Sequence, residues 1–371
     1  MENTNDTIKL EEYINSKCPN CGSELKFLPS STQTKCVSCD STFEIDCIKE
    51  GYLDEEEVNF TETIEKLSKA NILKEVVKNM HCENCGATIN INNHSVSTSC
   101  PYCGSHKVVS ENKEEEIIKI TGVLPFVKNE QDVKKIFKDW VKNRFFAPNK
   151  FKKGLITPTF SGIYIPYYTF DSNTISHYSG YRGDYYYVTK RVKTKDGYKT
   201  VTERRVRWSY RSGVIEHFFD DVLIIGTKNP LNNLVTQASN FDLKHLQLYK
   251  EEFLLGYYCE KPSVNLEGGF TLAQEDMKQD IKVMCINAIG GDTYRDLRFT
   301  TNYFDVTFKQ IMLPIYSGCY EYNNKNYNFI VNGQTGKFAG KCPISPLKVT
   351  LLVLFILLIV ILIGALLYYY S

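Results

Sequence analysis

The sequence predicts an α+β protein built from two cysteine-rich N-terminal modules, an aromatic-rich antiparallel β body with packed helices, and one hydrophobic C-terminal helix. Three observations predict it. Eight of the 13 cysteines form four Cys-x-x-Cys pairs, aromatic residues make up 13% of the chain (25 Tyr and 21 Phe), and a stretch of 22 residues without a charge precedes Ser371. Aromatic side chains suit half-buried pleated surfaces, which favours a β-rich body.

The C-terminal stretch, Val349–Tyr370, reads VTLLVLFILLIVILIGALLYYY. A helix of that length is about 33 Å long, enough to cross the hydrocarbon core of a bilayer. A core helix of a globular protein normally shows a polar face, and this stretch has none. Tyr368–Tyr370 suit the interface at one end, and Lys341 and Lys348 suit the other. We expect a transmembrane anchor over 347–371.

The position of this stretch predicts the topology of the protein. The N-terminus, MENTNDTIKLEEYINSK, is polar and lacks the apolar region of a secretory signal. A span that ends one residue before the terminus enters the membrane after the rest of the chain is made. We therefore expect a single-pass protein of the cell membrane, C-terminally anchored, with the bulk of the chain in the cytoplasm.

The N-terminal third repeats one metal-binding pattern. Fourteen residues separate the two Cys-x-x-Cys pairs of each module, and the modules lie 64 residues apart. Zn²⁺ prefers four soft ligands in a tetrahedron, and one Cys-x-x-Cys turn supplies two thiolates. The sequence predicts zinc ribbon 1 over 1–50, zinc ribbon 2 over 81–110, and two structural Zn²⁺ ions. The expected ligands are Cys18, Cys21, Cys36, Cys39, Cys82, Cys85, Cys100 and Cys103.

Four thiolates per site indicate a structural metal. A catalytic zinc keeps an open position for water, and these sites fill all four positions with cysteine. A thioredoxin-like redox role would need one Cys-x-x-Cys in a βαβ context. The chain also lacks a Ser/His/Asp order, a paired-carboxylate motif and a cofactor loop, so we expect neither an enzyme nor a small-molecule substrate.

Two segments separate these modules from the body. After the acidic run at 54–57, the stretch 51–80 places Ile64, Leu67, Ile72, Val76 and Val77 in an amphipathic pattern, which predicts a linking helix. Residues 111–117 begin ENKEEE, which predicts a charged linker. The α+β body is expected over 118–346.

Within the body, periodicity predicts two helices, over Asp132–Phe145 and Phe270–Ile289. A short helix is expected within Asp242–Leu255. Strands are expected over Ile117–Val127, Gly162–Asp171, Tyr178–Tyr187, Phe218–Gly226, Phe304–Tyr322 and Lys325–Gly340.

Tyr185–Tyr210 is the clearest hairpin signal, because Asp196-Gly197 is a type I′ turn pair between runs of β-formers. This turn would place Val192 opposite Val201, Lys190 opposite Glu203, and Tyr185 opposite Trp208. The segment Lys190–Arg211 holds nine Lys/Arg against two acids. Three interpretations stay open: contact with anionic lipid headgroups, contact with nucleic-acid phosphates, or a solvated edge that resists aggregation. The candidate contact residues are Lys190, Arg191, Lys193, Arg204, Arg205 and Arg207.

Several motifs together resemble one bacterial family. They are GIYIPYYTFDSN, HYSGYRGDYYYVT, FFDDVLI and TFKQIMLPIY followed by YNFIVNGQTGKFAGKCPIS, all behind the cysteine modules. The family is that of zinc-ribbon membrane proteins of the YdjG type, often catalogued as TFIIB-type zinc-ribbon or PriA-like (primosomal protein N′) proteins. The resemblance implies the eight cysteines as zinc ligands and a role beside PspA-type phage-shock proteins and SPFH-like partners.

The catalogue name PriA-like implies a helicase, but the sequence lacks the nucleotide-binding loop that a helicase needs. A P-loop reads G-x-x-x-x-G-K-[ST], yet Val331 stands in place of its first Gly and Phe338 follows Lys337. We expect a membrane-anchored, cytosol-facing adaptor or scaffold that binds protein partners in envelope-stress, phage-shock-like assemblies. The alternative is a nucleic-acid-binding zinc-ribbon protein tethered to the membrane. A net charge of +1 and a pI near 7.4 argue against a protein whose surface is built around contacts with nucleic-acid phosphates.

Overall fold

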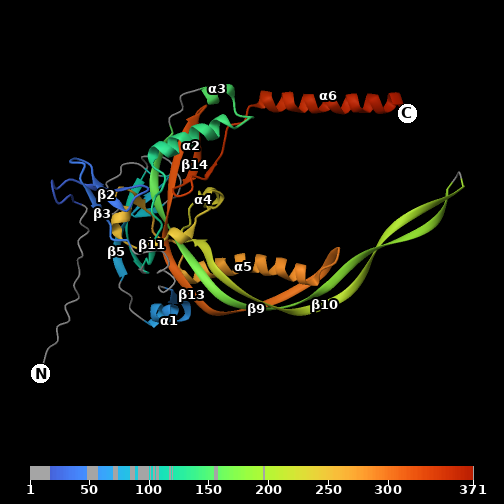
Figure 1. Cartoon of the computed structure of the whole chain (residues 1–371), viewed down its shortest axis with the longest axis horizontal. Coiled ribbons are helices and arrows are strands. Elements are labelled where there is room, and N and C mark those ends of the chain that lie inside the picture. Colours follow the sequence, from blue (N-terminus) through green and yellow to red (C-terminus); the bar gives the residue numbers. More distant parts are fainter. Residues whose placement is uncertain are drawn as a thin grey trace.

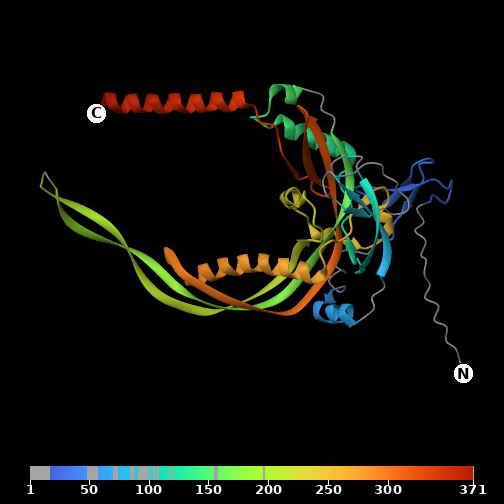
Figure 2. The ribbon, with the colours of Figure 1, turned by 180° about the vertical axis from the view of Figure 1, so that it is seen from behind.

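The computed structural model describes residues 17–47, 57–69, 74–83, 88–90, 100, 102, 105, 108–116, 118, 120–153, 158–194 and 197–370. These residues form an α+β structure in which two long projections leave one body (Figure 1). One projection is the C-terminal helix. The other is a curved arm of three strands and one helix. In both views, the arm and the C-terminal helix leave the same side of the body (Figure 2).

Two sheets organise the chain. The first is antiparallel and contains β1 (Leu25–Leu28), β2 (Gln33–Cys36) and β3 (Thr42–Glu44) in that order. The second has twelve strands along the path β11-β8-β13-β9-β12-β6-β5-β7, with β10 beside β9, β4 and β14 beside β13, and β15 beside β14. Its pairs are antiparallel except β12 with β9 and β13 with β8.

The bounds of the remaining elements are as follows. The strands of the second sheet are β4 (Val58–Asn59), β5 (Lys74–Cys82), β6 (Thr88–Asn90), β7 (Val108–Glu116), β8 (Gly122–Val123), β9 (Thr159–Thr194), β10 (Gly197–Ile225), β11 (Gln247–Leu248), β12 (Tyr258–Cys259), β13 (Thr293–Tyr322), β14 (Lys325–Asn332) and β15 (Phe338–Gly340). The helices are α1 (Phe60–Lys69), α2 (Glu130–Lys142), α3 (Asn149–Lys153), α4 (Asn232–Ala238), α5 (Leu266–Ile289) and α6 (Pro346–Tyr370), with 3₁₀ turns η2 (Leu243–His245) and η3 (Glu251–Leu254).

The structure corrects both segments expected between the cysteine modules and the body. The helix predicted over 51–80 ends at Lys69, and Val76 and Val77 lie in strand β5. The charged linker predicted over 111–117 is mostly strand β7, which pairs antiparallel with β5 along its whole length. Pairing across a sheet satisfies the backbone N–H and C=O groups of both segments, and this tertiary gain overrides local periodicity and charge.

The arm is built from strands far longer than the sequence predicts. Gly162–Asp171 and Tyr178–Tyr187 are not separate strands but parts of β9, which runs for 36 residues beside the 30 of β13 and the 29 of β10. Between the two predicted strands, the buried hydroxyls of Ser172 and Thr174 donate hydrogen bonds of 3.2 and 2.8 Å to carbonyls of β13 and β10. The polar residues are therefore satisfied within the sheet, and the strand continues through them.

The β9–β10 hairpin confirms the predicted hairpin, but its register differs by two residues. Val192 lies opposite Lys199 rather than Val201, and Trp208 lies opposite Gly183 rather than Tyr185. The Trp208 ring covers Gly183, where an added Cβ would lie 2.7 Å from the ring. A large ring thus lies across from a glycine in the observed register. Because the shift is an even number of residues, every side chain stays on the predicted face.

Helices α2 and α5 confirm the two helices predicted from periodicity. Asn129 caps α2 through a capping box with Asp132. The apolar stripe of α2 is buried at Val133, Phe137, Trp140 and Val141. Helix α5 packs along the strands of the arm and buries Ala273, Met277, Ile281 and Cys285 on one face.

Aromatic rings fill the core of the body, as the composition predicts. Phe126 stacks on Tyr257 with ring centroids 4.0 Å apart, and Phe338 lies 4.4 Å from Trp140. The two-residue turn between β13 and β14 contains Asn323, whose φ is positive (52°), as tight hairpin turns require. The short helix expected within Asp242–Leu255 is instead the pair of 3₁₀ turns with β11 between them.

Helix α6 begins against the body and then leaves it (Figure 1). The Ser345 N–H donates to the Phe146 carbonyl (2.8 Å), and Lys348 Nζ donates to the Ala147 carbonyl (2.7 Å). Within the part of the chain that the structure describes, one helix, Pro346–Tyr369, is long and apolar enough to cross a membrane, and no part of it is buried. Its length and composition agree with the transmembrane helix expected from the sequence.

Candidate metal centre

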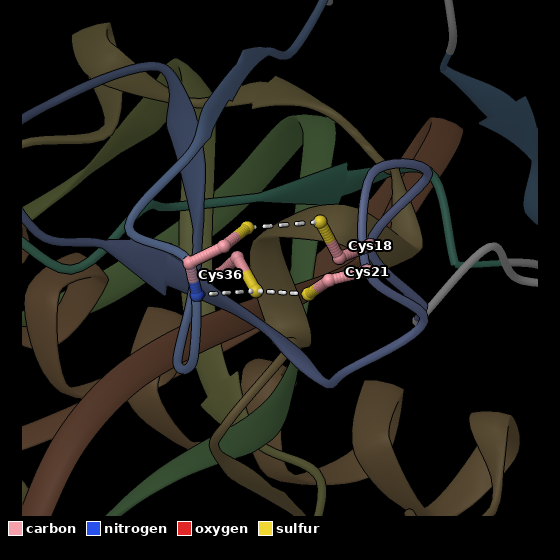
Figure 3. A group of neighbouring side chains, drawn as sticks. Cys18, Cys21 and Cys36 are labelled. Atoms are coloured by element: carbon pink, nitrogen blue, oxygen red, sulfur yellow. Dashed lines mark hydrogen bonds between the residues drawn. The ribbon is translucent and has the colours of Figure 1, made fainter.

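Zinc ribbon 1 brings its four predicted ligands together. Cys18 and Cys21 precede β1, Cys36 ends β2, and Cys39 lies in the turn before β3. Cys18 Sγ lies 3.6 Å from Cys39 Sγ, and Cys21 Sγ lies 3.5 Å from Cys36 Sγ. All four sulfur atoms lie within 4.8 Å of one another. Figure 3 shows the side chains of Cys18, Cys21 and Cys36 pointing into this cluster.

The sulfur positions fit a tetrahedral metal site. Zn–S bonds of about 2.3 Å place the sulfur atoms of a tetrahedron about 3.8 Å apart, close to the separations of this cluster. Four thiolates complete the coordination of Zn²⁺ and leave no position for water or substrate. The cluster can therefore bind zinc as a closed, structural site.

The local backbone explains how each pair is shaped. Gly22 follows the first pair with φ of 72°, and Asp40 follows the second with φ of 59°. This left-handed conformation favours glycine and is tolerated by Asp. The Asp40 carboxylate also binds Lys35 Nζ at 2.8 Å. The N–H groups of Ser38 and Cys39 point at Cys36 Sγ from 3.4 and 3.5 Å, as N–H groups around a thiolate do.

The pKa values of Cys18, Cys21 and Cys39 shift in different directions. Burial of the sulfur atom raises the pKa of Cys18 to about 11. The hydrogen bond between Cys39 Sγ and Ser41 Oγ (3.2 Å) lowers the pKa of Cys39 to about 6. A backbone hydrogen bond from Ser23 lowers the pKa of Cys21. Because metal binds the thiolate form, the exposed Cys21 and Cys39 are the two ligands that ionise more easily than an ordinary cysteine.

Zinc ribbon 1 is fixed to the body through its sheet. Phe27 of β1 meets Phe253 edge to face at 5.4 Å, and its N–H donates to the Leu255 carbonyl at 3.0 Å. Ser30 bonds the Phe126 carbonyl through its N–H (3.0 Å) and the Val127 carbonyl through its hydroxyl (2.6 Å). The sheet faces the body, and Cys21 and Cys39 lie at the solvent-exposed end of the module.

The second cysteine module is described only in part. Cys82 and Cys100 are both buried. They share one cluster with Tyr102 of the same module and with Ile163 and Tyr167 of the body. Cys85 and Cys103 lie outside the described residues. Among the residues it describes, the structure therefore places one cluster of four cysteines, and the second zinc site of the sequence stays a prediction.

A buried carboxylate holds this second module to the body. Glu260 accepts a hydrogen bond from the Tyr102 hydroxyl and one from Asn229 Nδ2 (3.4 Å). Burial raises the pKa of Glu260 to about 7. The sequence carries no signal for the contact with Tyr102, since the two residues are 158 positions apart.

The six candidate basic residues all lie near the free end of the arm and are exposed, but on two faces. Alternation along the strands places Arg191, Lys193 and Arg204 on one face and Lys190, Arg205 and Arg207 on the other. On the first face, Arg204 lies over the Tyr185 ring at 4.3 Å. On the second, Glu203 binds Lys190 (2.7 Å) and Arg205 (3.2 Å).

The structure adds a buried charged cluster that sequence reasoning missed. Lys309 of β13 is 4% exposed, and its Nζ lies 3.3 Å from carboxylate oxygens of both Glu57 and Asp221. Asp171 of β9 accepts bonds from the Asp221 N–H (2.5 Å) and the Thr307 hydroxyl (3.2 Å). Three carboxylates thus surround one ammonium group. A lysine inside the apolar run TFKQIML was the one signal in the sequence.

Comparison with known proteins finds one distant relationship. No family model matches the chain. No solved structure matches it either. The chain is a distant homologue of the uncharacterized protein YdjG of Bacillus subtilis (strain 168): the two are 25% identical over 343 residues, which cover 91% of this chain and 92% of YdjG.

Proposed function

We propose that this protein is a membrane-anchored adaptor that presents zinc ribbon 1 to protein partners in the cytosol. The observation that carries the proposal is the closed four-cysteine cluster, whose coordination is complete and whose outer end faces solvent. A metal without an open position holds a surface in shape rather than performing chemistry. The apolar helix α6 supports attachment to a bilayer.

The reducing cytosol is the compartment that suits this chemistry. Cysteines there stay as thiolates for metal rather than pairing as disulfides. As partners we propose PspA-type and SPFH-like membrane proteins in an envelope-stress response, because the family resemblance implies them. Nucleic acid is the competing partner, but the lysines of zinc ribbon 1 are partly engaged: Lys35 pairs with Asp40, and Lys26 packs against Gly256.

A single surface substitution tests the adaptor role. Val37, between the ligands Cys36 and Cys39, is 52% exposed, and Val37→Asp places a charge on the outer end of the module. Cells that make the tagged full-length variant at native level should yield about tenfold less crosslinked partner. A loss of this size is typical when one well-buried interface contact is removed. Zinc content should not change. Val283→Asp on the exposed face of α5 is the matched control. Equal partner recovery from both variants, or DNA recovered in place of protein, would contradict the proposal.

Topology is tested separately with a protease. An N-terminal tag on the full-length protein should survive protease added to intact spheroplasts and disappear once the membrane is permeabilised. The reason is that α6 is the one candidate span among the described residues, and the proposed function places the residues before it in the cytosol. Loss of the tag from intact spheroplasts would place the body outside and remove the cytosolic adaptor role.

A further inference from the structure

The free end of the arm is a two-stranded hairpin without a covering layer. Pairing between β13 and β9 starts at Gly183, opposite Thr293, and α5 ends at Ile289. Beyond that point, residues 184–194 and 197–207, here called the outer hairpin, form strand pairs only with each other among the described residues. At the base of the hairpin, the Tyr185 N–H also donates to the Asp292 carboxylate (2.7 Å). Figure 2 shows this hairpin as the outermost part of the arm. A two-stranded hairpin alone is marginally stable in water, so a surface that binds it would add order.

The two faces of the outer hairpin differ in charge. Asp184 and Glu203, the acidic residues among its described positions, both lie on the face that also carries Lys190, Arg205 and Arg207. The same face also carries Lys199. At the same described positions, the opposite face has no acidic residue. It carries Tyr185, Tyr187, Arg191, Lys193, Tyr198 and Arg204, together with threonines and Val206. This second surface is named the acid-free face.

Aromatic rings stand among the cations of the acid-free face. Tyr187 is 69% exposed and Tyr198 is 74% exposed. Exposed tyrosines beside Lys and Arg are typical of the headgroup layer of a membrane, where the ring meets the acyl boundary and the hydroxyl stays hydrated. The combination of Tyr187, Tyr198, Arg191, Lys193 and Arg204 therefore matches an anionic, half-apolar surface.

The anchor indicates which anionic surface is near. Helix α6 and the arm leave the same side of the body and run in the same direction (Figures 1 and 2), so the arm lies on the side where α6 would enter a bilayer. Arg and Lys are costly in hydrocarbon, and the outer hairpin cannot lie there beside α6. To lie in the headgroup layer, the arm must change its angle to α6 at residues 341–345, which form neither helix nor strand. This change would open the hydrogen bonds of Ser345 and Lys348 to the body.

We propose that the acid-free face binds the phosphate groups of anionic lipids in the bilayer that α6 spans. The inference rests on membrane attachment in the proposed function and adds to it a second contact that lays the arm on the membrane. Each basic residue near an anionic membrane contributes roughly a fivefold gain in binding, and salt screens it.

Protease accessibility in a defined bilayer tests this contact. Full-length protein is placed in nanodiscs of phosphatidylcholine with or without about 30% phosphatidylglycerol, and chymotrypsin cleavage after Tyr187 and Tyr198 is timed. We expect cleavage at least about tenfold slower with the anionic lipid, and recovery in high salt. The variant Arg191→Gln/Lys193→Gln/Arg204→Gln should lose this protection. The matched variant Lys190→Gln/Arg205→Gln/Arg207→Gln, with the same charge change on the other face, should keep most of it.

Two outcomes overturn the inference. One is equal cleavage in neutral and anionic nanodiscs. The other is protection by an added DNA duplex in neutral nanodiscs but not by the anionic lipid, which would assign the face to nucleic acid. Failure of membrane attachment is seen separately, because protein that does not co-purify with nanodiscs lacks a functioning anchor whatever the outer hairpin does.

Discussion

Replacing Cys36 by Ser should remove one zinc ion per chain and unfold zinc ribbon 1. Cys36 is fully buried and lies 3.5 Å, sulfur to sulfur, from Cys21. A structural zinc contributes about 10–16 kcal/mol in model peptides, far more than three short strands gain by burial. We therefore expect proteolysis within residues 17–47, while the aromatic clusters keep the body folded.

Zinc content by mass spectrometry of the purified protein measures this effect, and limited proteolysis locates it. Cys47→Ser is the matched control, because Cys47 is a partly buried cysteine outside the four-sulfur cluster. Metal held by the second cysteine module is the same in both variants and cancels in the comparison. Equal zinc content in the Cys36 and Cys47 variants would show that the cluster does not hold the metal.

Lys309→Met should cost about 3 kcal/mol of unfolding free energy, because it leaves the buried Asp171 and two partly buried carboxylates without their cation. Lys309 Nζ contacts Glu57 and Asp221, and Asp171 lies beside them. The cluster sits where both neighbours of β9 carry bulges, between Phe219 and Val222 on β10 and between Phe304 and Thr307 on β13. The cation thus holds the acidic residues together at the irregular point of the arm.

Urea denaturation of the full-length protein in detergent measures the loss, with Lys278→Met on the exposed side of α5 as control. The loss should be smaller near pH 5 than near pH 8. Burial raises the pKa of Asp171 to about 6, above its unfolded value, so falling pH neutralises this carboxylate in the folded state and relieves the repulsion. Adding Asp171→Asn should restore part of the stability at the higher pH. Unfolding at the same urea concentration as the Lys278 variant would show that the cluster needs no cation.

Local patterns predicted those elements whose contacts are close in sequence. The spacing of Cys18, Cys21, Cys36 and Cys39 determined a cluster because each pair is one turn, and a short hairpin joins the two. Helical periodicity located α2 and α5 because one face of each is buried whatever it packs against. The length of the uncharged run located α6 in the same way.

Predictions failed where a partner strand decides the outcome. The helix expected over 51–80 and the linker over 111–117 contain two strands that pair with each other, and neither signals its partner locally. The register of the β9–β10 hairpin, which places Trp208 across from Gly183, differs by two residues from the one that the turn residues predict. These choices depend on the fit of side chains between distant segments.

The sequence by itself determined the cysteine ligands of zinc ribbon 1, the amphipathic helices and the apolar terminal helix, because the energy of each comes from its own residues and its immediate surroundings. Tertiary structure alone decided the long arm, the separation of the basic residues into an acid-free and a mixed face, and the burial of Lys309 among carboxylates. Those features require strands from separate parts of the chain to meet in one register, and no local pattern contains that information.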